Sequence, residues 1–232
     1  MNTKQIFILV FLVLLADQAL KIYIKTTMPI NTSNEIFGTW FQLYFVENPG
    51  MAYGWKFGGN WGKLMLTIFR LGAVAFGTFY LRRIIRMGYH KGFIICASLI
   101  YAGAIGNLID SCFYGLIFDK GMIYDPIAGD YSIYNGIAQF SKNGYAALLH
   151  GNVVDMLYFP VLKGTFPSWF PIWGGERFEF FRPIFNIADA AISSGIFTII
   201  FFQSRFFKKD KEEASEANVD TETVITDDNQ IS

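Results

Sequence analysis

"FNIADAAISSGIFTIIFFQ" (residues 185–203) is apolar enough to lie in a lipid bilayer, yet Asn186 and Asp189 stand at its start. A carboxylate near the hydrocarbon of a membrane is costly, and ionisable residues in such positions are usually paired or functional. An apolar residue in place of Asp189 would make a better membrane anchor. The acid therefore either has a partner that offsets its desolvation or takes part in chemistry.

The composition of the whole chain points to a membrane protein. Of the 232 residues, 53% are hydrophobic and only 16% are charged, whereas a soluble domain has about 25% charged residues. The 19 basic and 19 acidic residues balance, so the chain lacks the basic footprint of a nucleic-acid-binding protein. Two cysteines are too few for a disulfide framework.

Four stretches are long enough to cross a bilayer, which takes about 20 mostly apolar residues per helix. They are residues 5–24, 64–81, 92–109 and 184–207. No small-x-small cleavage site follows the first stretch, so we expect an uncleaved anchor rather than a signal peptide. The predicted fold is an all-α membrane protein with four transmembrane helices, plus a small β or loop platform at the outer interface.

Basic residues set the expected orientation. The loop at 82–91 carries four of them, and the end of the last helix is also basic, whereas the loop between the first two helices contains one lysine. The positive-inside rule therefore predicts that both termini are cytoplasmic and that segments 26–62 and 110–183 lie outside. Residues 1–207 would form the membrane domain, and the polar, acidic residues 208–232 a disordered cytoplasmic tail.

The outer segments have patterns of their own. Residues 40–55, "WFQLYFVENPGMAYGW", alternate aromatic and polar side chains up to the turn sequence at 48–50, which predicts a strand or hairpin at the interface and a candidate mobile cover. Residues 151–159, "GNVVDMLYF", predict a second strand. The stretch 111–150 is rich in Gly, Tyr and Asn and has no firm structural assignment.

Acidic residues gather near the predicted outer face. Asp17 and Lys21 are four positions apart on the first helix and can pair. The acids that end the third helix and begin the fourth are each preceded, three positions earlier, by an asparagine, Asn107 and Asn186, whose amide could donate to the acid. Each acid alone also has a structural explanation, such as a helix-end or solvent-facing position. The set is Asp17, Asp110, Asp155 and Asp189.

Two carboxylates in one site carry more information than one. Like charges a few ångströms apart cannot both ionise easily, so the pair holds a single proton near neutral pH. One member can then act as a base on water while the other donates to a carbonyl oxygen, as in the aspartic proteases. The sequence has no H-E-x-x-H zinc motif, no G-x-S-x-G elbow and no P-loop spacing to support another chemistry. Arg70, midway along the second helix, is expected to pair with an interior acid.

Five ordered blocks resemble the signature blocks of lipoprotein signal peptidase, the type II signal peptidase of bacteria. They are "DQALK" (17–21), "ENPGMAYG" (47–54), "GAIGNLID" (103–110), "GNVVDM" (151–156) and "FNIADAAI" (185–192). The resemblance implies a four-helix membrane aspartyl endopeptidase whose catalytic dyad is Asp155 and Asp189, without metal or cofactor. The supporting or substrate-binding residues that it implies are Asp17, Lys21, Asn48, Gly50, Asn107, Asp110 and Asn186.

The same resemblance implies a substrate and a location. The substrate would be a prolipoprotein whose lipobox cysteine carries a diacylglyceryl group, cleaved just N-terminal to that cysteine at the periplasmic face of the bacterial inner membrane. Its lipid chains would stay in the bilayer, and cyclic peptides such as globomycin would inhibit the enzyme.

The chain departs from the family pattern in two places. Ser111 stands where the family usually has an arginine, so the cation of the polar network is missing or comes from elsewhere, Arg182 being one candidate. A long insertion at about 113–148 separates Asp110 from Asp155 and could serve as a lid or a substrate-selecting surface.

Two other classes of protein stay open. A small membrane transporter or proton-coupled carrier would use buried acids as a relay, and it predicts acids near the bilayer midplane and an internal repeat. A scaffold or assembly factor would only pair its acids with Arg70 and Lys21. The clustering of the acids at one face and the lack of an evident repeat favour the peptidase.

Overall fold

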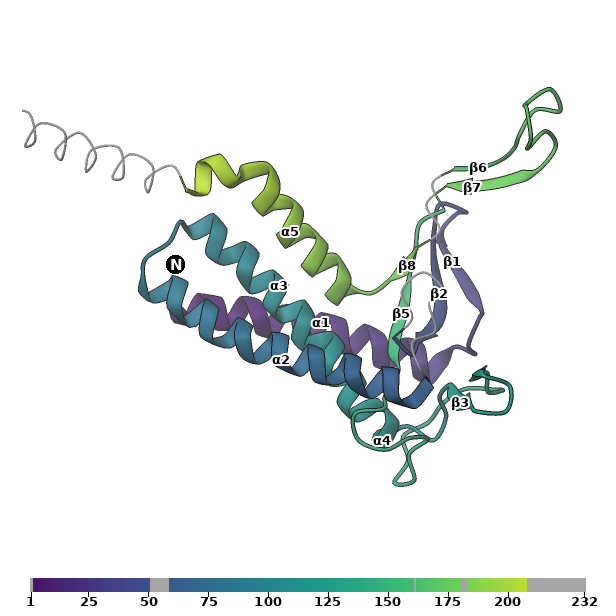
Figure 1. The fold of residues 1–232 in the computed structure, drawn as a ribbon, viewed down its shortest axis with the longest axis horizontal. Helices are drawn as coiled ribbons and strands as arrows, with labels where there is room; N and C mark the ends of the chain where they lie inside the picture. Colours follow the sequence, from purple (N-terminus) through teal and green to yellow (C-terminus); the bar gives the residue numbers. More distant parts are fainter. Residues whose placement is uncertain (1, 51–58, 161, 181–182, 208–232) are drawn as a thin grey trace, which may run out of the picture.

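The computed structural model describes residues 2–50, 59–160, 162–180 and 183–207 (Figure 1). Four long helices run alongside one another, and each is long and apolar enough to cross a membrane. These helices confirm the four predicted membrane spans. Their bounds are α1 Thr3–Thr27, α2 Gly59–Arg86, α3 Lys91–Ile109 and α5 Ile187–Phe206.

Helix α3 is the packing centre of the bundle. It contacts α1, α2 and α5, and 50% of its apolar span is buried, against 17% or less for the other three. The outward faces of those three helices expose large apolar side chains such as Phe7, Phe69 and Phe201. This is the distribution of a bundle whose outer helices face lipid rather than water.

Glycines let α3 and α5 approach closely. A Cβ atom at Gly103 would lie 2.3 Å from the carbonyl oxygen of Ala188, and one at Gly195 would lie 2.7 Å from the carbonyl oxygen of Cys96. The hydrophobic effect does not drive helices together in lipid, so their association depends on close packing, which small residues permit. The close contact brings the start of α5, with Asp189, against α3.

The end of α3 is irregular. The helix continues as a π-helical turn, η1 (Asp110–Tyr114), and a short helix, α4 (Gly115–Ile117). π-helical turns occur mostly as local features of α-helices and are frequent at functional sites. Here the turn begins at Asp110, one of the acids singled out in the sequence.

A four-stranded antiparallel sheet lies at one end of the helices (Figure 1). In spatial order its strands are β1 (Ser33–Phe37), β2 (Phe41–Asn48), β5 (Val153–Tyr158) and β8 (Ile184–Phe185). Strand β5 is the predicted second strand, and it carries Asp155 opposite Val46 of β2. Because β8 leads directly into α5, the sheet also fixes where that helix begins.

The aromatic segment at 40–55 is confirmed as a strand as far as Asn48. Its hairpin partner is the preceding strand β1, and the hairpin turn lies at 38–40. The predicted turn at 48–50 is also present, since Asn48 Oδ1 accepts from the backbone N–H of Gly50. The remainder of the segment, residues 51–58, is outside the described part of the chain.

The insertion at 113–148 packs against the domain. It contains a hairpin of β3 (Ile123–Asp125) and β4 (Asp130–Ser132). Its buried side chains Phe118 and Ala138 share one core with Ile24 of α1 and with Phe45 and Met156 of the sheet. A further hairpin, β6 (Leu162–Thr165) and β7 (Arg177–Phe180), projects from the sheet (Figure 1).

Candidate active site

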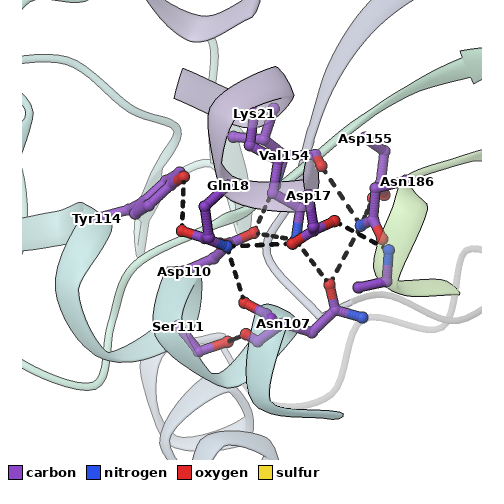
Figure 2. A network of polar contacts seen from close by, with 12 residues as sticks. Asp17, Gln18, Lys21, Asn107, Asp110, Ser111, Tyr114, Val154, Asp155 and Asn186 are labelled. Atoms are coloured by element: carbon purple, nitrogen blue, oxygen red, sulfur yellow. Dashed lines mark hydrogen bonds and ion pairs between the residues drawn. The ribbon is translucent and has the colours of Figure 1, made fainter. Parts of the chain in front are cut away.

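Polar side chains from α1, α3 and α5 and from the sheet meet in the part of the helix bundle that lies next to the sheet. Most of them are buried. Figure 2 shows the part of this cluster around Lys21 and Asn186. The cluster consists of Asp17, Gln18 and Lys21 from α1, Asn107 and Asp110 at the end of α3, Asp155 from β5, and Asn186 and Asp189 at the start of α5.

Lys21 is the central cation of the cluster. Its fully buried Nζ lies 2.9 Å from Asp17 Oδ2 and 2.8 Å from Asp110 Oδ2, and it donates to Asn107 Oδ1 at 3.0 Å. The predicted pairing of Asp17 with Lys21 is therefore confirmed. A buried charge is tolerated only with close partners of opposite charge, which Lys21 has on two sides.

The two acids paired with Lys21 tie the site together. Asp17 Oδ1 accepts from the backbone N–H of Ala188 at 2.9 Å, which fixes α1 to the start of α5. Asp110 accepts from Gln18 at 2.8 Å and from the backbone N–H of Val154 at 3.3 Å, which fixes the end of α3 to β5. Both acids thus hold the backbone elements that carry Asp155 and Asp189.

Two asparagine amides connect Asp155 with Asp189. Asn186 Nδ2 donates to Asp155 Oδ1 at 2.7 Å, and Asn107 Nδ2 donates to Asp189 Oδ1 at 2.7 Å. Asn186 Nδ2 also reaches Asn107 Oδ1 at 3.1 Å, so the four side chains form one hydrogen-bonded chain. The structure therefore places both acids on one continuous network.

The predicted pairing of each asparagine amide with the acid three residues later is wrong. Asn186 is the N-cap of α5, in an extended conformation, and its Oδ1 accepts from the backbone N–H of Asp189 at 2.8 Å, so its amide points away toward β5. Asp110 turns toward Lys21 instead, which leaves the amide of Asn107 for Asp189. Each amide thus crosses to an acid on another element.

Asp155 has an unusual proton affinity for an aspartate. Burial, and then the charge of Asp189, raise the pKa of Asp155 to about 7, although Lys21, Asn186 and Asn48 act in the opposite direction. Only 4% of Asp155 is exposed, in keeping with desolvation as the largest cause. This group can therefore gain or lose a proton near neutral pH.

Asn48 and Gly50 lie at the end of β2. The side chain of Asn48 hydrogen-bonds to Asp155, and its Oδ1 also accepts from the backbone N–H of Gly50 at 2.8 Å. Gly50 has a φ of 107°, a left-handed conformation that favours glycine. The turn thus brings a further amide to Asp155, and Gly50 shapes the backbone that holds this amide.

A cavity of about 810 Å³ runs along α5 from the half-buried Asp189. It is mostly apolar, with hydroxyl groups on one helix face, and its lining includes Phe185, Ser193, Ser194 and Phe201. The cavity touches Asp189 directly, whereas Asp155 is buried and does not line it. A volume of this size accommodates a ligand or an apolar peptide segment.

Sequence reasoning missed Gln18. Its Nε2 donates to Asp110 at 2.8 Å and to Asp17 at 3.1 Å, and its Oε1 accepts from Tyr114 at 3.1 Å. The residue lies inside the "DQALK" block, directly after Asp17, and that position was a usable signal.

Arg70 has a different partner from the expected one. Its guanidinium donates to Ser111 Oγ at 2.6 Å, and no described carboxylate lies within ion-pair distance of it. The other cation candidate, Arg182, is outside the residues that the structure describes.

A second buried polar cluster lies on the other side of β2. Glu47 forms an ion pair with Lys25 and accepts from Tyr134 at 2.8 Å and from the backbone N–H of Met122 at 2.9 Å. Asn152, which follows the insertion, donates to Glu47 at 2.7 Å. Glu47 thus binds two points of the insertion to the strand that ends in Asn48.

Aromatic rings surround the cation of this second cluster. The Nζ of Lys25 lies 5.1 Å from the ring centre of Phe118, 5.5 Å from that of Tyr134 and 5.2 Å from that of Tyr145. Cation–π contacts of this kind stabilise a desolvated ammonium group. All three rings belong to the insertion, which therefore helps to bury Lys25.

Fold and site together define a membrane protein with a desolvated acid and amide network at the ends of its helices. A family model described as signal peptidase (SPase) II matches residues 9–205. The lipoprotein signal peptidase of Porphyromonas gingivalis is 45% identical over 200 residues, which cover 85% of this chain and 81% of that protein. The lipoprotein signal peptidase of Amoebophilus asiaticus is 33% identical over 204 residues, covering 85% and 78%.

The fold has a counterpart among solved structures. A bacterial membrane enzyme solved by the in meso method at 2.3 Å aligns with a TM-score of 0.52 at 23% identity, covering 88% of this chain and 89% of that one. The chain belongs to the signal peptidase II family, which confirms the resemblance found in the sequence, and it is a multi-pass bacterial membrane protein.

Proposed function

We propose that this protein is an aspartyl endopeptidase that removes the signal peptide from diacylglyceryl-modified prolipoproteins, cleaving N-terminal to the lipidated cysteine. Membership of the signal peptidase II family supports the class of substrate. The observation that carries the chemistry is the hydrogen-bonded chain that joins Asp155 to Asp189 through two amides.

In this mechanism the dyad holds one proton and one water molecule. The ionised carboxylate removes a proton from the water, whose oxygen attacks the carbonyl carbon of the scissile peptide bond. The protonated carboxyl group gives its proton to the carbonyl oxygen, which yields a neutral diol. Collapse of the diol breaks the carbon–nitrogen bond as a proton moves to the leaving amine, and the dyad returns to its starting state.

The surroundings suit the two roles. The pKa of Asp155, about 7, permits proton exchange at neutral pH. Asn186 and Asn107 each donate to one oxygen of a dyad carboxylate, which keeps both groups oriented through turnover. The base and the acid are properties of the coupled pair, so neither role belongs to one residue alone.

The cavity along α5 provides a place for the substrate. The apolar part of the signal peptide would lie against Phe197 and Phe201, with the scissile bond at Asp189 and the lipid chains in the bilayer. The basic residues at 82–91 and after α5 support an orientation with cytoplasmic termini and an active site at the outer face of the inner membrane. Globomycin is the expected type of inhibitor.

The test is cleavage of a lipidated prolipoprotein peptide in detergent. Asp155→Asn and Asp189→Asn should each abolish cleavage, because a dyad with one neutral amide can no longer serve as both acid and base. Glu35→Gln, a change at an exposed acid of β1, is the matched control and should keep full activity. Globomycin should inhibit the wild type and a metal chelator should not; normal turnover by either dyad variant would refute the proposal.

A proton-coupled carrier is the alternative use of buried acids. Such a protein needs them near the middle of its spans. Here Asp110 lies toward the end of the continuous span Lys91–Ile117 and Asp189 is in the first turn of α5, so neither acid lies at the middle of its span. That placement favours the peptidase.

A further inference from the structure

Arg70 lies in the middle of the apolar helix α2, where a charge is costly unless it is paired or functional. The side chain is half-buried and donates to Ser111 Oγ at 2.6 Å. The Ser111 hydroxyl donates in turn to the backbone carbonyl of Asn107 at 2.8 Å. Asn107 is the residue whose amide donates to Asp189, so two hydrogen bonds connect the guanidinium with a residue that holds the dyad.

The charge of Arg70 acts on the acids of the site. Its guanidinium interacts electrostatically with Asp110, Asp189 and Asp155, without a direct ion pair to any of them among the described residues. The network has four carboxyl groups but only two cations within the described part of the chain. By element, these charged groups are Asp17 and Lys21 on α1, Arg70 on α2, Asp110 on η1, Asp155 on β5 and Asp189 on α5.

Lys21 is already committed to two of these acids, Asp17 and Asp110, at 2.9 and 2.8 Å. Lys21 also acts on Asp155, and Arg70 is the second described cation whose charge can offset the negative charge of the dyad. Ser111 is buried, and its small side chain leaves room for the guanidinium between α2 and α3. A serine at this position thus fits with a cation that comes from another helix.

We propose that Arg70 is a positioning residue for the dyad: held by Ser111, it supplies the positive potential that lets Asp155 and Asp189 keep one negative charge in a desolvated site. The inference rests on the proposed function, because it concerns the same two acids. In the family pattern an arginine usually follows the acid that corresponds to Asp110. In this chain Arg70 of the neighbouring helix α2 would supply the positive charge instead, and this role accounts for a charged residue inside an apolar helix.

The consequence is a shift in the pH dependence of catalysis. A nearby cation favours the ionised form of a carboxylate, so its loss raises the pKa at which the dyad loses its first proton. The acid limb of the kcat/KM profile should then move to higher pH, by about one pH unit for the loss of one nearby charge. At a fixed pH on that acid limb, kcat/KM of the variant would be about tenfold lower than that of the wild type.

The experiment compares kcat/KM from pH 5 to pH 9 for the wild type, Arg70→Gln and Arg70→Lys. The acid limb of the glutamine variant should be shifted to higher pH. The lysine variant keeps the positive charge, so its acid limb should lie at the wild-type pH, with a lower kcat/KM. Arg82→Gln is the matched control, since Arg82 is an exposed cation on the same helix, 12 residues beyond Arg70. Its limb should stay where the wild-type limb lies.

An acid limb that is unmoved in Arg70→Gln would overturn the role of Arg70. If that variant does not accumulate, Arg70→Met removes the charge without burying an unpaired amide, and the same criterion applies to it. The proposed function is judged separately by Asp155→Asn and Asp189→Asn. Inactive dyad variants together with an unmoved Arg70→Gln profile would refute only the role of Arg70.

Discussion

Replacing Asp155 by asparagine should stabilise the fold above neutral pH while abolishing activity. The ordinary pKa of 3.8 rises to about 7 for this buried carboxyl. The difference is about three pH units, and each unit corresponds to about 1.4 kcal/mol, so ionisation of Asp155 costs the folded state about 4 kcal/mol. Asparagine keeps an oxygen to accept from Asn186 but carries no charge.

The sign follows from proton binding. Between pH 4 and pH 7 the folded protein holds the proton on Asp155 more tightly than the unfolded chain does, so the free energy of unfolding falls as the pH rises. The loss is complete above about pH 7. Between pH 5 and pH 8 it amounts to about 3 kcal/mol, which corresponds to a fall of about 6–12 °C in Tm. The Asp155→Asn variant should lack this contribution.

The assay is thermal unfolding in detergent, followed by tryptophan fluorescence at several pH values for wild type, Asp155→Asn and Asp189→Asn. Removing the charge at position 189 should reduce the pH dependence but not remove it, because burial is the larger cause of the raised pKa of Asp155. A curve for Asp155→Asn that runs parallel to that of the wild type would refute the reasoning. So would an Asp189→Asn curve as flat as that of Asp155→Asn, since repulsion would then dominate.

Three further substitutions test the packing around the site. Lys21→Met should destabilise the protein by about 3–5 kcal/mol, measured by denaturant unfolding in detergent, because two buried carboxylates lose their cation. Gly103→Ala should lower both Tm and kcat, since its Cβ would lie 2.3 Å from the carbonyl oxygen of Ala188 and force α3 and α5 apart. Gly72→Ala, where a Cβ atom meets nothing within 4 Å, is the control and should leave both unchanged. Glu47→Gln should make the insertion at 113–148 more sensitive to limited proteolysis; cleavage at the wild-type rate would show that Glu47 does not hold it.

The membrane helices could be predicted from the sequence because length and apolarity alone define a span. The predicted stretch 64–81 is shorter than the observed helix Gly59–Arg86. A helix can continue beyond the apolar stretch into the membrane interface because its backbone groups stay hydrogen-bonded to one another. The irregular turn after Ile109 could not be predicted, since the polar residues around it read as a helix end.

The candidate site was predictable as a set of residues but not as a set of contacts. Blocks of sequence identify Asp155 and Asp189, whereas the partner of each amide depends on how separate helices are packed. Asn186 illustrates this, because its N-cap role follows from the local sequence but its bond to Asp155 requires the approach of β5. Arg70 could not be paired with Ser111 from sequence spacing, since 41 positions separate them.

Strand β2 connects the insertion with the proposed chemistry. Adjacent residues of a strand point to opposite faces, and here Glu47 binds Tyr134 and Lys25 on one face while Asn48 hydrogen-bonds to Asp155 on the other. A disturbance of the Glu47 cluster is therefore one residue away from a group that holds Asp155. An insertion that were only a detachable lid would need no such buried ion pair. The contacts of Glu47 favour an insertion that acts as a fixed support for β2, through which changes in the insertion reach Asp155.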